Sequence, residues 1–178
     1  WVYEQARFYF PNSLLWTNDF GLMNNTANSA SNRSYMYGVA NALKDRELVD
    51  AFGMQSHYFN VNDLTSAEVT SVLNEVFDQT RLPIHITELD ISGSEEQQLE
   101  RYQKIFPSMW EHPAVERVNL WGWITGETWR HDEGHLTGLI NRDGSNKRPA
   151  LIWLETYFQD KLRTTSTELA SQLLLKDN

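Results

Sequence analysis

Short apolar runs alternate with amphipathic stretches along most of this chain. Four runs have the length and composition of β-strands, at residues 14–17, 52–58, 84–90 and 115–123. The intervening segments have helical spacing, at about residues 34–44, 65–77, 94–109 and 150–162. Strands that alternate with helices predict parallel βαβ units.

Two helix starts are marked by their capping residues. Thr65 is followed three residues later by Glu68, and Ser94 is followed by Gln97, which is the spacing of a capping box. Behind Thr65 an apolar stripe predicts a buried helix face, made of Val69, Val72, Leu73, Val76 and Phe77.

Other stretches predict loops and a tail. We expect loops in two segments that show neither the helical nor the strand spacing of apolar residues. They are the Asn- and Ser-rich residues 24–32 and the long segment 125–148. We expect one domain over residues 1–163 and a tail over 164–178, with one more short helix at 168–175.

Polar or aromatic residues cluster where each predicted strand ends. They are Asn18 and Asp19, Gln55 and His57, Glu88 and Asp90, and Trp121 onward. In a (β/α)8 barrel this edge carries the active site, but a whole barrel needs roughly 250 residues, so four strands are half of one. An open four-stranded α/β sheet is the alternative.

Composition narrows the class of partner. The net charge of −9 argues against nucleic acid and against an anionic membrane surface. No apolar run approaches the roughly 20 residues of a membrane span. With 7 Trp, 7 Tyr and 8 Phe the chain has aromatic side chains for a sugar-binding groove, although such residues also build cores.

The third strand carries the strongest candidate chemistry. Strand alternation predicts that Ile84, Ile86, Glu88 and Asp90 share one face, with the two acids at its end. A salt-bridged acid at a strand end is the structural alternative for Glu88. For His57 the alternative is a neutral histidine in the core.

Four segments, in order, resemble motifs of glycoside hydrolase family 10, the retaining endo-β-1,4-xylanases. They are Leu15-Trp16-Thr17-Asn18-Asp19-Phe20, Phe52-Gly53-Met54-Gln55-Ser56-His57, Ile86-Thr87-Glu88-Leu89-Asp90, and Val118-Asn119-Leu120-Trp121-Gly122-Trp123 with Trp129. Phe20 stands where the family usually has Tyr. The resemblance covers about residues 1–160 and implies the C-terminal half of a (β/α)8 TIM barrel, roughly strands 5–8.

The resemblance also implies roles for matching residues. Glu88 would be the nucleophile of a double displacement on xylan, with His57 and Asp90 holding it ionised and oriented. Asn18, Gln55, Trp121 and Trp129 would contact the sugar. The other tryptophans Trp1, Trp16, Trp110 and Trp153 we interpret as core residues.

A retaining glycosidase needs a second carboxyl group, and the family's Asn-Glu acid/base strand has no counterpart here. Nothing in the sequence places Glu127 or Glu133 across the sugar from Glu88. We therefore expect this chain alone to be inactive. Its partner would be the N-terminal half of the barrel, as another chain or a missing segment, or a second copy of itself.

No metal or organic cofactor is expected. The segment His131-Asp132-Glu133-Gly134-His135 has its Glu at the wrong position for a zinc motif. Two rival functions stay open: a non-catalytic carbohydrate-binding half-barrel, and an unrelated enzyme on an open sheet. A polymeric substrate implies a secreted or periplasmic protein, although no signal peptide is visible.

Overall fold

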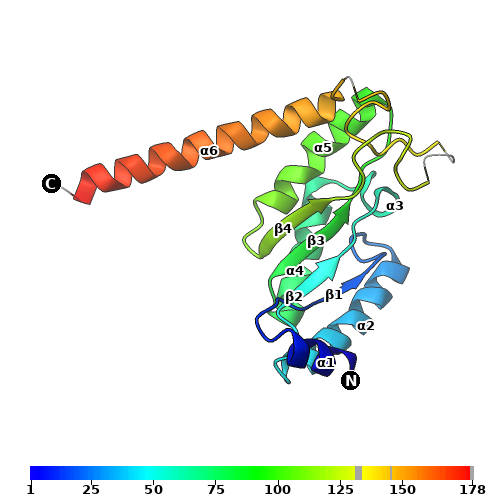
Figure 1. The fold of residues 1–178 in the computed structure, drawn as a ribbon, viewed down its shortest axis with the longest axis vertical. Coiled ribbons are helices and arrows are strands. Elements are labelled where there is room, and N and C mark those ends of the chain that lie inside the picture. Colours follow the sequence, from blue (N-terminus) through cyan, green and yellow to red (C-terminus); the bar gives the residue numbers. More distant parts are fainter. Residues whose placement is uncertain (131–133, 145, 177–178) are drawn as a thin grey trace.

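The computed structural model of the protein describes residues 1–130, 134–144 and 146–176, and among these the side chains up to residue 163. Its centre is a parallel sheet with the strand order β1-β2-β3-β4, which is the order of the strands along the chain (Figure 1). Each strand therefore lies beside its predecessor, as in the winding of a barrel, and not reversed at a switch point as in a doubly wound sheet.

The elements follow one another with short connections, apart from the long segment before the last helix. In chain order they are α1 Val2–Tyr9, β1 Trp16–Asp19, α2 Ala27–Lys44, β2 Ala51–Met54, α3 Tyr58–Val61, α4 Ser66–Thr80, β3 Ile84–Leu89, α5 Glu95–Trp110, β4 Val115–Leu120 and α6 Pro149–Lys176. All four predicted strands are present.

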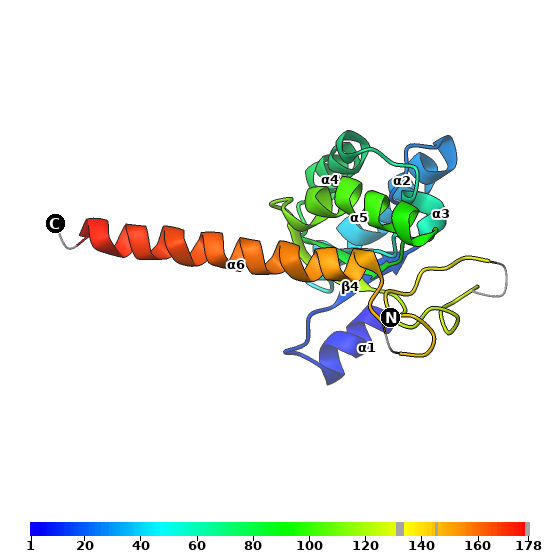
Figure 2. The same ribbon diagram turned by 90° about the horizontal axis from the view of Figure 1, so that it is seen from above.

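Helices α2, α4 and α5 lie on the same side of the sheet (Figure 2). The core fills the space between them and the strands. Phe52 and Met54 from β2 and Ile84 and Ile86 from β3 are completely buried there. The stripe predicted for α4 is confirmed at Val69, Val72, Leu73 and Val76, which are also completely buried.

Both predicted capping boxes are confirmed. The Thr65 hydroxyl accepts a hydrogen bond from the backbone N–H of Glu68, and Ser94 accepts one from Gln97. The backbone N–H of Thr65 in turn donates to the Glu68 carboxylate, and the backbone N–H of Ser94 donates to the side-chain oxygen of Gln97. These local contacts satisfy backbone groups that the first turn of a helix leaves unpaired.

Helix α2 begins earlier than predicted. Thr26 caps it by accepting from the backbone N–H of Ser29, so much of the expected loop at 24–32 is helical. The Asn- and Ser-rich composition is unfavourable for a helix in isolation. The buried side chain of Arg33, paired with Glu75 of α4 at 2.9 Å, anchors this stretch through tertiary contacts.

The last helix also differs from the prediction. A separate short helix was expected at 168–175, but α6 runs without interruption from Pro149 to Lys176 and extends away from the sheet (Figure 1). The division of the chain at residues 163 and 164 stays a prediction. Within the described part of the chain, no helix is both long and apolar enough to cross a membrane.

Candidate active site

The carboxylate of Glu88 lies at the end of β3, between side chains from the ends of β1 and β2. Asn18, near the end of β1, donates from Nδ2 to Oε1 at 3.1 Å. The Nε2 atom of His57, just beyond β2, lies 3.2 Å from Oε2. The backbone N–H of Glu88 donates to the carbonyl of Gln55. Parallel strands thus bring three predicted site residues to Glu88.

The strict alternation expected along β3 is wrong at Glu88. The hydroxyl of Thr87 donates to Oδ1 of Asn18 at 2.7 Å, so Thr87 and Glu88 contact the same side chain although they are adjacent. Ile84 and Ile86 point into the helix-side core instead. The pairing with β4 is irregular between Ile86 and Leu89, and this interruption turns Glu88 toward Asn18.

Asp90 lies behind His57 and is almost fully buried. Its Oδ2 atom is 3.1 Å from Nδ1 of His57, and its Oδ1 accepts from the backbone N–H of Tyr58 at 2.6 Å. A carboxylate therefore faces each ring nitrogen of His57. These two contacts fix the orientation of the imidazole ring between Glu88 and Asp90.

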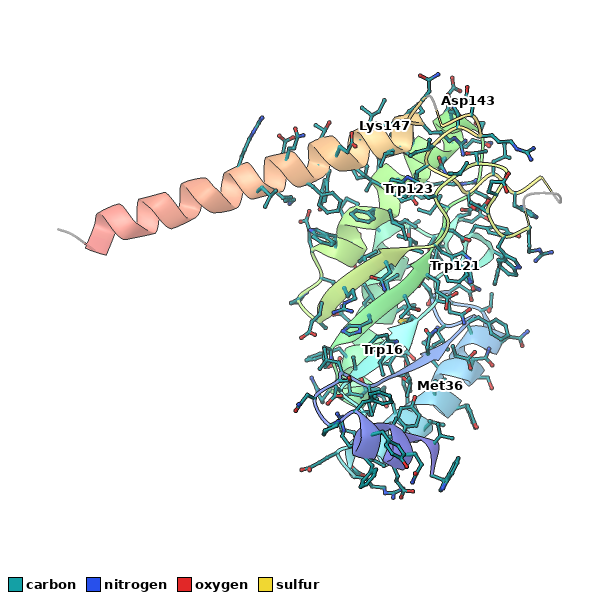
Figure 3. All side chains as sticks on the ribbon, in the orientation of Figure 1. Trp16, Met36, Trp121, Trp123, Asp143 and Lys147 are labelled. Atoms are coloured by element: carbon teal, nitrogen blue, oxygen red, sulfur yellow. The ribbon has the colours of Figure 1, made fainter. Side chains whose placement is uncertain are left out.

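Glu88 and His57 line a cleft of about 490 Å³. Five predicted site residues line it: Gln55, His57, Glu88, Trp121 and Trp129. Trp121 follows the end of β4, beside the long segment that leads to α6 (Figure 3). Asn18 takes part through its hydrogen bond to Glu88.

Aromatic rings surround His57. The ring centroid of Trp129 is 4.9 Å from that of His57, and those of Phe59 and Trp121 are 5.7 Å and 6.0 Å away. Trp121 and Trp129 are 44% and 46% exposed, so each keeps ring surface available to a ligand. Exposed aromatic surface beside hydrogen-bonding groups suits the apolar faces and hydroxyls of a sugar.

Three lining residues were not predicted as site residues: Phe20, Phe59 and Arg130. Phe20 was noted only as a departure from the family motif. The positions of Phe59, two residues after His57, and of Arg130, directly after Trp129, are the signals that could have indicated them.

The predicted core tryptophans divide into two groups. Trp16 and Trp153 are partly buried, and Trp16 packs against the His85 ring at 5.4 Å. The prediction is wrong for Trp1, which is 82% exposed at the start of α1, a helix without buried residues. Trp110 is 41% exposed, although one side of it packs on Phe158.

Two buried side chains hold the long segment after β4 against the end of β3. The amide of Gln98, fully buried on α5, donates to the carbonyls of Ile91, Thr137 and Gly138. The guanidinium of Arg148, 2% exposed, donates to the carbonyls of Gly93, Leu136 and Gly138. Burial lowers the pKa of Arg148 from its usual value. These contacts connect the segment that carries Trp129 to the segment after Glu88.

Among the residues that the structure describes, no three His, Asp or Glu side chains gather as metal ligands. Residues 131–133 of the segment compared with a zinc motif lie outside the described residues. His135, from the same segment, stacks on Tyr58 with ring centroids 4.4 Å apart.

The family model of glycosyl hydrolase family 10 matches residues 1–157. An endo-1,4-beta-xylanase B of Cellvibrio japonicus is 35% identical over 154 residues, which are 86% of this chain and 23% of that protein.

Solved structures agree in fold. A GH10 endoxylanase from a sugarcane soil metagenome has a TM-score of 0.69 at 22% identity, over 87% of this chain and 54% of that one. A thermostable mutant of a xylanase from Cellvibrio japonicus has a TM-score of 0.68 at 22% identity, over 84% of this chain and 51% of that one. The fold is thus part of a (β/α)8 barrel, as predicted.

The chain spans about half the length of these two solved relatives and a smaller share of the Cellvibrio xylanase B. The resemblance found in four sequence motifs is confirmed, because the family match over residues 1–157 includes all four strands of the sheet. The chain belongs to glycosyl hydrolase family 10.

Proposed function

We propose that this chain is the nucleophile-bearing part of a retaining endo-β-1,4-xylanase, with Glu88 as the nucleophile. The observation that supports this most directly is the position of the Glu88 carboxylate. It lines an aromatic cleft, with Asn18 donating to one of its oxygens and His57 in contact with the other. The matching relatives are named endo-1,4-beta-xylanases, which suggests xylan as the substrate class.

In the first step an oxygen of Glu88 attacks the anomeric carbon and the glycosidic bond breaks. An acid elsewhere in the site gives its proton to the leaving oxygen. Water, deprotonated by the same group, then displaces Glu88 and releases a sugar with its original anomeric configuration.

His57 and Asp90 serve Glu88 in this scheme. The imidazole of His57 lies against one oxygen of Glu88 and helps to hold the carboxylate in the orientation needed for attack. The buried Asp90 carboxylate holds the His57 ring at its other nitrogen. Asn18 donates to the other oxygen of Glu88 and limits its rotation. A fixed attack geometry contributes much of the rate gain of a covalent mechanism.

Trp121 and Trp129 would bind sugar rings by stacking, and Gln55 would add a hydrogen bond at the same wall. The chain would act outside the cell or in the periplasm, because a polymer such as xylan does not enter the cytoplasm.

The second carboxyl group would come from a segment equivalent to the rest of the relatives' barrel, in the same polypeptide or another. Retaining enzymes place their two carboxyl groups about 5–5.5 Å apart. Among the described residues that line the cleft, Glu88 is the one carboxylate. Glu127 instead pairs with Arg142 at 3.3 Å, and its side chain is 60% exposed. Glu133 lies outside the described residues.

That segment would cover the outer edge of β1. Within the described residues β2 is the one strand that pairs with β1, and on the outer edge of β1 the carbonyl of Trp16 accepts from the Tyr3 hydroxyl of α1. Next to it lies an apolar hollow of about 350 Å³ between α1 and β1. Phe8, Phe10 and Leu14 nearby are 74%, 62% and 54% exposed. Such a surface is typical of a contact with another part of a protein.

The test is covalent trapping. The purified chain, alone and mixed with a candidate complementary half, is incubated with a 2-fluoro xylobioside that carries a good leaving group. Intact mass spectrometry followed by peptide mapping locates any adduct. We expect an adduct on Glu88 in the mixture and none with Glu88→Gln. A folded mixture that hydrolyses xylan but is trapped at another residue would overturn the assignment of Glu88.

A second candidate function is carbohydrate binding without catalysis, favoured by the exposed rings of Trp121 and Trp129. It predicts xylo-oligosaccharide binding that Glu88→Gln leaves intact, together with no adduct and no hydrolysis even when the complementary half is present.

A further inference from the structure

We propose that Asn62 is a positioning residue for the reaction of Glu88, because it fixes the segment that carries His57 against the segment that carries Asp90. The inference rests on the proposed function, since it assumes that Glu88 is the nucleophile. Asn62 is not one of the described residues that line the cleft, so its effect on Glu88 passes through His57 and Asp90.

His57 stands immediately before α3, which lies beyond the carboxyl ends of β2 and β3 (Figure 1). This helix is only four residues long, Tyr58–Val61. A single helical turn is not stable on its own in water. The position and direction of α3, and with them the position of the His57 ring, therefore depend on contacts with other segments.

Apolar contacts hold α3 in place without setting its direction. The side chains of Tyr58 and Val61 are buried, at 5% and 0% exposure. The hydrophobic effect has no preferred direction, so burial alone lets the turn rotate. Hydrogen bonds have a preferred length and angle, and they decide how α3 is oriented.

Hydrogen bonds at both ends of α3 reach the same stretch of chain, residues 90–92. At the start, the backbone N–H of Tyr58 donates to Oδ1 of Asp90 at 2.6 Å. Just past the end, Nδ2 of Asn62 donates to Oγ of Ser92 at 2.8 Å, and the backbone N–H of Ser92 donates back to Oδ1 of Asn62 at 3.2 Å. Two points of attachment prevent the rotation that one would allow.

Ser92 is itself held from another side. It is 6% exposed, and its backbone carbonyl accepts from Nη1 of Arg101 on α5 at 2.6 Å. Because α5 holds Ser92 independently of Asn62, loss of the Asn62 contacts would release α3 and leave Ser92 in place. The His57 ring would then shift relative to Glu88, whose Oε2 lies 3.2 Å from Nε2.

The residue type at position 62 fits this role. An amide has both a donor and an acceptor, so one side chain satisfies the hydroxyl and the backbone N–H of Ser92 together. Asn62→Ala removes both hydrogen bonds. Asn62→Asp is the conservative variant, because one oxygen still accepts from the N–H and the other can accept from the Ser92 hydroxyl.

The first measurement observes the His57 ring in the purified chain alone. Proton–nitrogen correlation NMR records the ring nitrogens of the 5 histidines, and His57→Gln identifies the signals of His57. We expect Asn62→Ala to shift these signals and Asn62→Asp to shift them less. Asn74→Ala is the matched control, since Oδ1 of Asn74 lies 3.2 Å from Nε2 of His112, and it should shift the signals of His112 but not those of His57.

The second measurement is the rate of covalent trapping by the 2-fluoro xylobioside, with the complementary half present and the inactivator saturating. We expect Asn62→Ala to react about tenfold more slowly, with a half-saturating concentration within about twofold of the parent value. Asn62→Asp should recover most of the rate. A residue that only stabilised the fold would lower the urea midpoint without changing this rate, which is the result expected for Asn74→Ala.

Unshifted His57 signals in a folded Asn62→Ala would overturn the inference, and so would a parent rate of trapping. If Asn62→Ala fails to fold, Ser92→Ala replaces it, because it removes only the hydroxyl contact. Ser92→Ala should then shift the His57 signals by a smaller amount, and no shift would overturn the inference. Trapping of the parent protein at a residue other than Glu88 would instead contradict the proposed function, while the NMR comparison would still test whether Asn62 positions His57.

Discussion

Nε2 of His57 lies 3.2 Å from Oε2 of Glu88, although 30 residues that form α3, α4 and most of β3 separate them along the chain. The same imidazole faces the buried carboxylate of Asp90 through its other nitrogen. One ring thus lies between an acid that opens to the cleft and an acid sealed from solvent. The buried acid therefore positions the ring that contacts the exposed one.

Asp90→Asn should slow trapping of Glu88 by about 100-fold. An amide can still accept from the backbone N–H of Tyr58, but it replaces the carboxylate that holds Nδ1 of His57, so the ring that orients Glu88 is held less firmly. The measurement is the rate of adduct formation with the 2-fluoro xylobioside, in the presence of the complementary half. Asp63→Asn, whose side chain is 97% exposed, serves as the control and should react at the parent rate. A parent-like rate in Asp90→Asn would show that the buried charge is not needed.

Trp129→Ala should weaken xylo-oligosaccharide binding by about tenfold, because it removes exposed ring surface that lines the cleft. Titration of unbranched xylotetraose measures this. Trp1→Ala removes an indole that is 82% exposed and is not among the cleft residues, so it should leave the affinity unchanged. Equal losses in both variants would contradict a stacking role for Trp129.

Arg148→Met should lower the free energy of unfolding by about 1–3 kcal/mol, because the carbonyls of Gly93, Leu136 and Gly138 lose their donor. Urea unfolding followed by tryptophan fluorescence measures the change. We also expect weaker xylotetraose binding, since the segment that carries Trp129 is held by these contacts. The control is Arg142→Met, which removes an exposed ion pair and should change stability by less than about 0.5 kcal/mol.

The stability of the fold should decrease as the pH falls from about 7.5 to about 5.5. Burial lowers the pKa of His85, and the nearby charge of Arg117 lowers it further, against an opposing effect of Glu116. The folded state therefore holds His85 neutral, while the unfolded chain takes up a proton near pH 6.5, at about the usual pKa of histidine. Protonation of the unfolded state then favours unfolding in this range.

His85→Gln should reduce that pH dependence. Urea unfolding at pH 7.5 and pH 5.5 gives the loss of stability for each protein, and the loss should be smaller in the variant. Burial also lowers the pKa of His112, so His112→Gln should remove a further part of the dependence with the same sign. An unchanged loss in His85→Gln would contradict a neutral buried His85.

Local interactions made much of this protein predictable from its sequence. The caps at Thr65 and Ser94 depend on residues three positions away, and the stripe on α4 depends on the helical period alone. The four strands and the clustering of polar residues at their ends follow from the same kind of pattern. The convergence of Asn18, His57 and Glu88 could be predicted because parallel strands place their ends at one edge.

Only the tertiary structure decided the features that depend on contacts between distant segments. The side of β3 on which Glu88 lies is set by irregular pairing with β4, which overrides the two-residue period. The helical start of α2 depends on the pairing of Arg33 with Glu75 on another helix. Arg130 lines the cleft because Trp129, the residue before it, packs on His57 of a distant segment. In each case the deciding interaction joins residues far apart in the chain, and no local pattern encodes it.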